Sequence, residues 1–326
     1  MKKLTVILAL LLSCLVTLSL VGCDLLDSTV EMDDVSGSSD TSVDAETDSF
    51  DEEYDETPDT EEPLHDQSLE DQAKANMKTV TNMSSKGTVL TEMSMVIEGE
   101  TYEVLQGNET NIYICGDNEY AEIYMAQNAL GSVTQTLTES TRIGNSFYVY
   151  TLSQTDKSVE NYIIINATDS EIETAMETLG TKADELTYSI NHYQRVNEVK
   201  NDDGSVTYTC TGLRLSAATL YQETMCAVTT MMGVPSQMEI NREAAKYEVT
   251  IKDGKFVSVA VDLTIDMVLD INGQIVPVSC KYDIDHAYTY GDVEPISAPT
   301  EAGFSNAVVL TWTQYWELVQ QSTKVS

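Results

Sequence analysis

The most regular hydrophobic pattern in the chain lies between residues 255 and 271, where apolar and polar positions alternate. On one side stand Val257, Val259, Val261, Leu263, Ile265, Met267, Leu269 and Ile271, and between them Ser258, Ala260, Asp262, Thr264, Asp266, Val268 and Asp270. Alternation with period two places the two sets on opposite faces of a β-strand. Sixteen residues at roughly 3.3 Å each give a strand of about 50 Å, far longer than usual. The pattern therefore predicts a long strand with one apolar face that must be covered.

A second alternating segment, about residues 275–288, follows directly. Its apolar set is Val276, Val278, Cys280, Tyr282 and Ile284, and its polar set is Ser279, Lys281, Asp283 and Asp285. The dipeptides Asp253-Gly254 and Asn272-Gly273 bracket the first strand, and Asp203-Gly204 precedes another β-rich stretch. These dipeptides are typical of two-residue hairpin turns, so the strands are expected to be antiparallel.

Further segments rich in Tyr, Ile, Val and Thr predict strands in the first half of the chain. They run about 87–97, 101–106, 110–115, 120–126, 132–139, 143–153 and 160–166. Helical spacing of apolar residues predicts helices at about 69–83, 169–179 and 216–232, with a capping-box-like start at Ser68 and terminating residues Gly180 and Gly233. The predicted fold class is α+β, with a large curved antiparallel sheet packed against a few helices.

The first 23 residues have the pattern of an export signal. Lys2 and Lys3 precede an uncharged apolar run from residue 4 to 21, and Leu20, Val21, Gly22 and Cys23 follow the pattern of a lipobox. A small residue directly before a cysteine is what lipoprotein processing requires, so residues 1–22 are expected to be removed and Cys23 to carry diacylglycerol. The alternative is an uncleaved membrane helix, and the run is at the lower limit for one. In both cases the remainder lies outside the cytoplasmic membrane, anchored to it.

Residues 23–67 predict a disordered acidic spacer behind the lipidated cysteine. Between Cys23 and Gln72 stand 20 acidic residues and no Lys or Arg, with few apolar residues. Such a segment cannot bury enough surface to offset its ordering entropy, and its like charges favour extension. A calcium-binding or partner-binding acidic tail is the alternative, but no Gly-centred calcium loop is present.

The charge of the whole chain narrows the class of partners. Lys and Arg number 17 against 54 Asp and Glu, a formal net charge of -37. Phosphate recognition relies on clustered basic residues, so nucleic acid is excluded as a partner.

Cysteine and histidine patterns indicate no cofactor and no metal site. Cys115, Cys210, Cys226 and Cys280 remain after processing, and they either form disulfides or stay as buried thiols. No Cys-x-x-Cys spacing occurs, and His286 in a strand points away from Asp283 and Asp285. His65 falls in the spacer and His192 has no metal-ligand spacing.

No catalytic motif is present, since the chain has no Gly-x-Ser-x-Gly elbow, phosphate-binding Gly-Lys loop or His-Glu-x-x-His helix. The sequence therefore predicts a protein that is not an enzyme. The Met-rich stretch 225–232 is either a soft binding groove or part of the core.

The order of these features resembles one lipoprotein superfamily, that of LolA, LppX and LprG and their uncharacterised Gram-positive relatives. The features are the lipobox, the acidic spacer, one early helix, the long hairpins, two mid-chain helices and the closing segment 288–296, Tyr-Thr-Tyr-Gly-Asp-Val-Glu-Pro-Ile. The resemblance covers about residues 68–297. It implies an incomplete β-barrel wrapped around helices, in which several members hold acyl chains. The family has no catalytic or ligand residue that can be transferred to this chain.

Residues 298–326 form an extension beyond the resemblance. Val309, Trp312, Trp316 and Val319 fall at helical spacing and predict an amphipathic helix. This helix either packs on the domain or stays exposed to touch membrane or a partner. The scarcity of Lys and Arg before Lys324 disfavours anionic lipid.

Together the patterns predict a lipid-anchored, extracytoplasmic, non-enzymatic lipoprotein that binds a lipid or other hydrophobic ligand in the concave face of its sheet. The residues expected to line that cavity are Val257, Val259, Val261, Leu263, Ile265, Met267, Val276, Val278 and Tyr282. The alternative is a structural or envelope-interaction surface protein whose core is fully packed and takes no small ligand.

Overall fold

The computed structural model describes residues 66–97, 99–129, 132–154, 159–179, 188–231, 236–271, 274–300 and 302–324. The signal segment, the lipobox with Cys23, the spacer up to His65 and the Asn272-Gly273 turn lie outside these residues. What the sequence predicts for those segments therefore stays a prediction.

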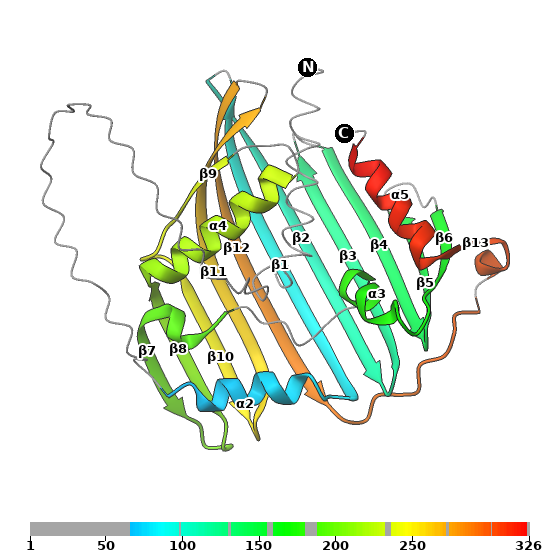
Figure 1. Cartoon of the computed structure of the whole chain (residues 1–326). Coiled ribbons are helices and arrows are strands. Elements are labelled where there is room, and N and C mark those ends of the chain that lie inside the picture. Colours follow the sequence, from blue (N-terminus) through cyan, green and yellow to red (C-terminus); the bar gives the residue numbers. More distant parts are fainter. Residues whose placement is uncertain are drawn as a thin grey trace, which may run out of the picture.

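In the part of the chain that the structure describes, thirteen strands form one open sheet (Figure 1). Their bounds are β1 Asn82–Ile97, β2 Glu100–Cys115, β3 Asn118–Ala129, β4 Ser132–Ile143, β5 Ser146–Ser153, β6 Val159–Asn166, β7 Tyr193–Lys200, β8 Val206–Leu213, β9 Ser236–Ile240, β10 Lys246–Lys252, β11 Lys255–Ile271, β12 Gln274–Tyr290 and β13 Val308–Thr311. The order is β13-β6-β5-β4-β3-β2-β1-β12-β11-β10-β8-β7, with β9 paired to β11. Every pairing is antiparallel except that of β13 with β6. The predicted α+β class with a large curved sheet is confirmed.

Four helices in the described part of the chain lie on the same face of this sheet (Figure 1). They are α2 Ser68–Met77, α3 Ile172–Leu179, α4 Leu215–Met231 and α5 Trp312–Lys324, with short 3-10 turns η1 Ile190–His192 and η2 Ala302–Asn306. We call the face that they cover the inner face and the opposite one the outer face. None of these described helices has the length and apolarity needed to cross a membrane.

The long hairpin is confirmed, since β11 and β12 each run for 17 residues. Asp253 and Gly254 make the turn before β11 with φ of 52° and 67°, the left-handed conformations that such a turn requires. The first helix is shorter than expected. It ends at Met77, and β1 already begins at Asn82, because the backbone of Thr81 and Asn82 accepts hydrogen bonds from Gly116 and Gly291.

The alternation predicted for β11 is wrong at one residue, Val257. The pairing of β10 with β11 shifts register there: Thr250 faces Ser258 but Ile251 faces Phe256. A β-bulge of this kind leaves one residue unpaired and reverses the parity beyond it. As a result Phe256 is buried, at 1% exposure, while Val257 is only partly buried and does not share the face of Val259.

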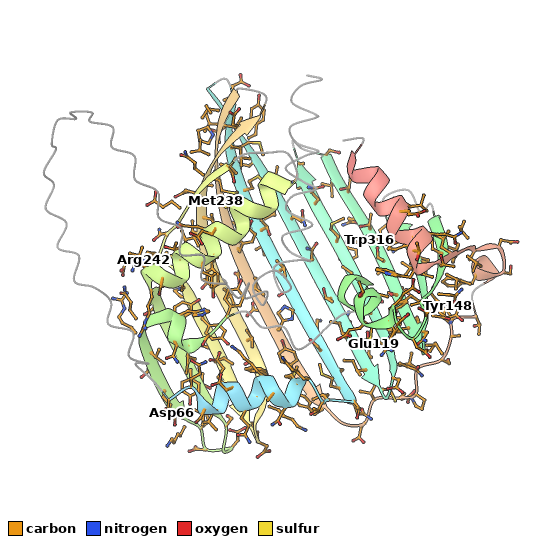
Figure 2. The ribbon with its side chains drawn as sticks, in the orientation of Figure 1. Asp66, Glu119, Tyr148, Met238, Arg242 and Trp316 are labelled. Carbon is orange, nitrogen blue, oxygen red and sulfur yellow. The ribbon has the colours of Figure 1, made fainter. Side chains whose placement is uncertain are left out.

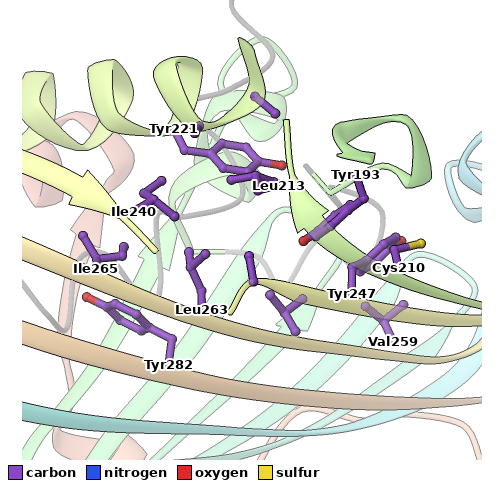
Figure 3. Packing of buried hydrophobic residues seen from close by; sticks show 14 of the residues in the cluster. Tyr193, Cys210, Leu213, Tyr221, Ile240, Tyr247, Val259, Leu263, Ile265 and Tyr282 are labelled. Atoms are coloured by element: carbon purple, nitrogen blue, oxygen red, sulfur yellow. The ribbon is translucent and has the colours of Figure 1, made fainter. Parts of the chain in front are cut away.

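Two hydrophobic clusters lie between the inner face and the helices. The larger cluster joins α2, α4, η1 and strands β7 to β12 with parts of β1 and β2, and Figure 3 shows Tyr221 of α4 and Leu263 of β11 facing the same layer. The smaller cluster joins Phe147 and Ile165 of β5 and β6 to Ala175 of α3 and Trp312 of α5. The core is thus concentrated toward the two ends of the sheet.

The C-terminal extension passes around the β6 edge of the sheet. Phe304 of η2 packs edge-on against Tyr148, Tyr150 and Tyr162, with ring centroids 5.0–6.3 Å apart. Val309 lies in β13 rather than in the predicted helix, which starts at Trp312. Trp312 is buried, and Figure 2 shows Trp316 on α5 at the same end of the sheet as Tyr148. The interpretation as a helix packed on the domain therefore holds for the start of α5.

Candidate ligand site on the inner face of the sheet

The predicted cavity residues are brought together on the inner face, with the exception of Val257. The buried members are Val259, Val261, Leu263, Ile265, Met267, Val276, Val278 and Tyr282. They belong to the larger cluster, in which Ala73 and Met77 of α2 and Ala217, Ala218 and Tyr221 of α4 also take part. This apolar half of the inner face is thus packed against helices (Figure 3).

The inner face continues from this apolar half into a polar half. Directly opposite residues in antiparallel strands share a face, so the register can be followed across the sheet. One row runs from Leu263 and Tyr282 through Thr91 on β1, Gln106 on β2, Gln127 on β3 and Thr134 on β4. We call the four residues Thr91, Gln106, Gln127 and Thr134 the amide row.

Buried amide atoms in and beside this row have no hydrogen-bond partner. Gln106 is 2% exposed, and its Oε1 atom is unpaired. Nε2 of Gln127, directly opposite, and Oδ1 of Asn108, two residues along β2 on the same face, are also buried and unpaired. A buried amide without a hydrogen bond lowers the free energy of unfolding, because its lost hydration is not replaced. Such atoms in a folded protein therefore require an explanation.

Hydroxyl groups extend the polar half onto β4. Its inner-face hydroxyl residues are Ser132, Thr134, Thr136, Thr138 and Ser140, which face β3 residues of the inner face in the register. Thr138 pairs through its hydroxyl with Thr151 of β5 at 3.3 Å. The polar half therefore presents amides on β2 and β3 beside a ladder of hydroxyls on β4, with apolar residues such as Ile123 and Met125 of β3 between them.

Charge is nearly excluded from this surface. Between Tyr102 of β2 and Arg142 of β4, the described inner-face positions carry only Glu119 and Arg142, which pair with each other at 3.3 Å. Carboxylates such as Glu109, Glu122 and Glu139 have the opposite parity and lie on the outer face. The polar half is thus a neutral surface with one compensated ion pair at its end.

The described helices pack on parts of the inner face other than the polar half. α2 packs on β10 and β11, α4 on β9, and α5 on β6 and β13. No described helix packs extensively against β2, β3 or β4. A ligand placed there would lie between the two clusters, beside the apolar half.

A buried carboxylate, that of Glu70, holds α2 on the inner face near β10 and β11, away from the polar half. Glu70 is fully buried and accepts hydrogen bonds from the Ser189 hydroxyl at 3.1 Å, the Ile190 amide at 3.2 Å and the Tyr247 hydroxyl at 3.0 Å. Lys74 lies 3.6 Å from it. Because every partner belongs to the protein itself, this cluster is structural.

The two histidines on described residues are partly buried, and both have a lowered pKa. Burial, aided by the charges of Lys74 and Arg214, lowers the pKa of His192 to about 4, and its Nδ1 lies 2.6 Å from the Tyr221 hydroxyl. Burial also lowers the pKa of His286, which sits opposite Gly87 on the inner face, away from the outer-face residues Asp283 and Asp285. Within the described ranges no group of three His, Cys, Asp or Glu side chains is arranged to hold a metal.

The four cysteines in the described residues are free thiols. Cys210 and Cys280 are buried, and burial raises the pKa of each to about 12. Neither is suited to act as a thiolate nucleophile. Of the two possibilities that the sequence left open, the structure has the buried thiol for these two residues.

Two hollows lie at the far ends of the long strands. One, of about 460 Å³, is lined by Met238 of β9, Met267 and Val278 together with outer-face residues of β1, β11 and β12. The other, of about 730 Å³, is lined by Met93, Tyr102 and Val104 together with outer-face residues such as Glu92 and Lys281. Outer-face residues predominate in both hollows, and the side chains of Met267 and Val278 are themselves buried, so these hollows lie outside the apolar half of the inner face.

Comparisons with known proteins give little further guidance. No family model matches the chain, and no curated protein matches it. A DUF1329 family protein from Desulfovibrio piger is similar over 72% of this chain and 96% of its own, with 14% identity and a TM-score of 0.21. An N-terminal dehydratase from a difficidin assembly line covers 67% of this chain and 81% of its own, with 10% identity and a TM-score of 0.12. Similarities this weak carry no argument about fold or function.

The amide row was missed by sequence reasoning for a definite reason. The predicted strands 101–106 and 110–115 left a break at Gly107 and Asn108, and the strand 120–126 stopped before Gln127. In the structure β2 and β3 run through both points. Val104 and Ile112 have the parity of the inner face, but Gln106, Asn108 and Thr110 between them are polar, so no apolar alternation marked the inner face of β2. The Met-rich stretch 225–232 extends past the described end of α4, so its role as groove or core stays a prediction.

Proposed function

We propose that the chain is a lipid-anchored, extracytoplasmic and non-enzymatic protein that binds a lipid or other hydrophobic ligand on the inner face of its sheet. The anchor is Cys23, the spacer carries the domain away from the membrane, and the sheet provides the binding surface. The resemblance to the LolA, LppX and LprG superfamily supports this proposal, because the open curved sheet agrees with the fold that the resemblance implies.

The observation that carries the proposal is the apolar inner face of β1 and β2, on which no described helix packs extensively. Met93, Met95 and Val104 are buried apolar residues of β1 and β2 that extend the larger cluster toward strands on which no described helix packs extensively. An apolar surface of this kind is favourable only when something apolar covers it. An acyl chain lying along β1 and β2 would provide that cover.

The proposal is tested by extracting the protein itself. The full chain, purified from its host membrane and washed free of bulk lipid, is treated with organic solvent, and the extract is analysed by mass spectrometry. We expect non-covalent lipid at close to one equivalent per chain.

A matched pair of variants controls this experiment. Val104→Asp places a charge on the inner face, whereas Leu105→Asp places it at the next, exposed position on the outer face. The first variant should lose most of the bound lipid and the second should retain it. Equal lipid in both variants, or none in the parent chain, would contradict the proposal.

The structural alternative has one specific observation in its favour. Val259 and Leu263, which were expected to line a cavity, are packed in a cluster with side chains of α2 and α4. A protein without lipid in its extract, whose inner face reacts with no lipid probe, would be a rigid surface platform for a protein partner at the envelope. Cross-linking on intact cells would then identify that partner.

A further inference from the structure

We propose that the amide row and the hydroxyls of β4 bind the uncharged, hydroxyl-rich part of an amphiphilic ligand, such as the sugar or glycerol group of a neutral lipid. This inference rests on the proposed function, since it assigns the head group of a ligand whose hydrocarbon part lies on the apolar residues of β1 and β2. It adds a polar recognition site to the inner face.

The first step is the unpaired state of the amides. Oε1 of Gln106, Oδ1 of Asn108 and Nε2 of Gln127 comprise two acceptors and one donor within two rows of adjacent strands. Gln106 is almost completely buried, so bulk water is a poor explanation for its missing partner. A ligand that supplies both donors and acceptors satisfies all three atoms, and a hydroxyl group does both.

The second step is the absence of charge. Recognition of phosphate or carboxylate ordinarily uses Arg or Lys. On the described inner face of β1 to β4, the basic side chain is Arg142, whose charge is paired with that of Glu119 through Nη2, although its buried Nε makes no hydrogen bond. The neutral amides and the Ser and Thr hydroxyls of β4 therefore favour an uncharged polar group over an anionic one.

The third step is the position of the row at a boundary. Across the strands in one direction, the amide row continues to Tyr282 and Leu263 of the larger hydrophobic cluster. Two residues further along β1 and β2, the parallel row contains Met93 and Val104. In the other direction, the amide row leads to Thr134 and its neighbours on β4. A molecule with adjoining apolar and hydroxyl-bearing parts matches this boundary in both respects.

Three probes with the same twelve-carbon chain separate head-group recognition from chain binding. They are dodecyl maltoside, which has an uncharged sugar, dodecylphosphocholine, which has a phosphate, and dodecanoate, which has a carboxylate. Binding to the full chain held in amphipol is measured by equilibrium dialysis, with each probe below its micellar concentration. We expect dodecyl maltoside to bind about tenfold more tightly than the other two, as two or three additional hydrogen bonds allow.

The variant for this test is Gln106→Met with Gln127→Met, which keeps side-chain length and removes the amides. Its matched control is Asn111→Leu, which removes an amide from the outer face of the same strand, where Asn111 pairs with Glu122 at 3.1 Å. The double variant should lose the preference for maltoside while its melting temperature stays level or rises, because unpaired buried amides are replaced by apolar groups. The control should keep the preference.

Each other outcome has a definite meaning. Equal binding of the three probes would overturn head-group recognition and leave the lipid-binding proposal intact. A fall in melting temperature of the double variant with unchanged maltoside preference would show that the amides have a structural role, and would also overturn the inference. Failure of all three probes to bind would count against the proposed function itself.

Discussion

Single buried residues decide how firmly the helices are held on this sheet. Glu70 is the clearest case, since it connects α2 to η1 and β10 through three hydrogen bonds. A buried carboxylate is stabilising only while its partners are present. Without the Glu70 carboxylate, its hydrogen-bond donors would in turn be buried without an acceptor.

Glu70→Ala should lower the free energy of unfolding by about 3–5 kcal/mol, because it leaves the Ser189 hydroxyl, the Ile190 amide and the Tyr247 hydroxyl without an acceptor. Asp71→Ala, at the next and exposed position of the same helix, should cost about 1 kcal/mol or less. Urea denaturation at pH 7 measures both values. Similar costs for the two variants would show that the Glu70 cluster contributes little.

The partly buried histidines His192 and His286 predict how stability depends on pH. The pKa of His192 is about 4 in the fold against about 6.5 in the unfolded chain, so the unfolded state binds more protons between these values. The stability that neutral His192 contributes is therefore fully present above about pH 6.5 and is lost as the pH falls toward 4. His286, whose pKa is also lowered by burial, acts in the same direction.

His192→Gln should reduce this loss by about 2 kcal/mol between pH 7 and pH 4. The measurement is urea denaturation at both pH values, with His286→Gln and the double variant as comparisons. A parent chain that is equally stable at both pH values would contradict the burial of the neutral imidazole. Asp203, whose pKa is lowered by its bonds from Ser205 and Lys252, adds a further loss only at more acidic pH.

At the scale of the element, alternation predicted the strands well and failed where a local irregularity intervened. The pattern of β11 and β12 located both strands and the Asp253-Gly254 turn. It could not show the bulge at Val257, because an inserted residue changes parity without changing composition. It also broke β2 at Gly107, although a continuous ladder to β1 and β3 holds that glycine in the strand.

The candidate site was predictable only in its apolar half for a related physical reason. Apolar alternation marks a buried face, whereas Thr, Ser, Asn and Gln on β2 to β4 are typical of an exposed one. Tertiary pairing, which a single sequence does not display, placed these residues opposite one another on the inner face. The C-terminal helix was predicted from spacing, but Val309 lies in the short strand β13, which pairs in parallel with β6.

Trp312→Ala should lower the free energy of unfolding by about 3–5 kcal/mol, because Trp312 is 6% exposed and packs on Phe147, Ile165 and Ala175. Trp316→Ala, one turn further along α5 and 40% exposed, should cost about 1–2 kcal/mol. Chemical denaturation of the two variants compares them directly. A larger cost for Trp316 would mean that α5 is held by its other face.

For the whole molecule, we propose a lipid anchor at Cys23, a spacer and an open sheet that binds the ligand. Cys23→Ala should abolish incorporation of labelled fatty acid and leave an unprocessed precursor of higher mass. Labelling in living cells followed by gel electrophoresis measures both effects, with Cys115→Ala as the control that changes neither. Normal labelling of the Cys23 variant would contradict the lipid anchor.

We propose that the inner face of the sheet holds hydrocarbon, and photolabelling tests this most directly. A fatty acid with a photoreactive diazirine is bound to the full chain, irradiated, and the cross-linked residues are identified by peptide mass spectrometry. The account predicts labels on inner-face residues of β1 and β2, foremost Met93, Met95 and Val104, and their loss under competition by unlabelled lipid. Labels confined to outer-face residues such as Val96 and Leu105, or labels that unlabelled lipid does not displace, would contradict it.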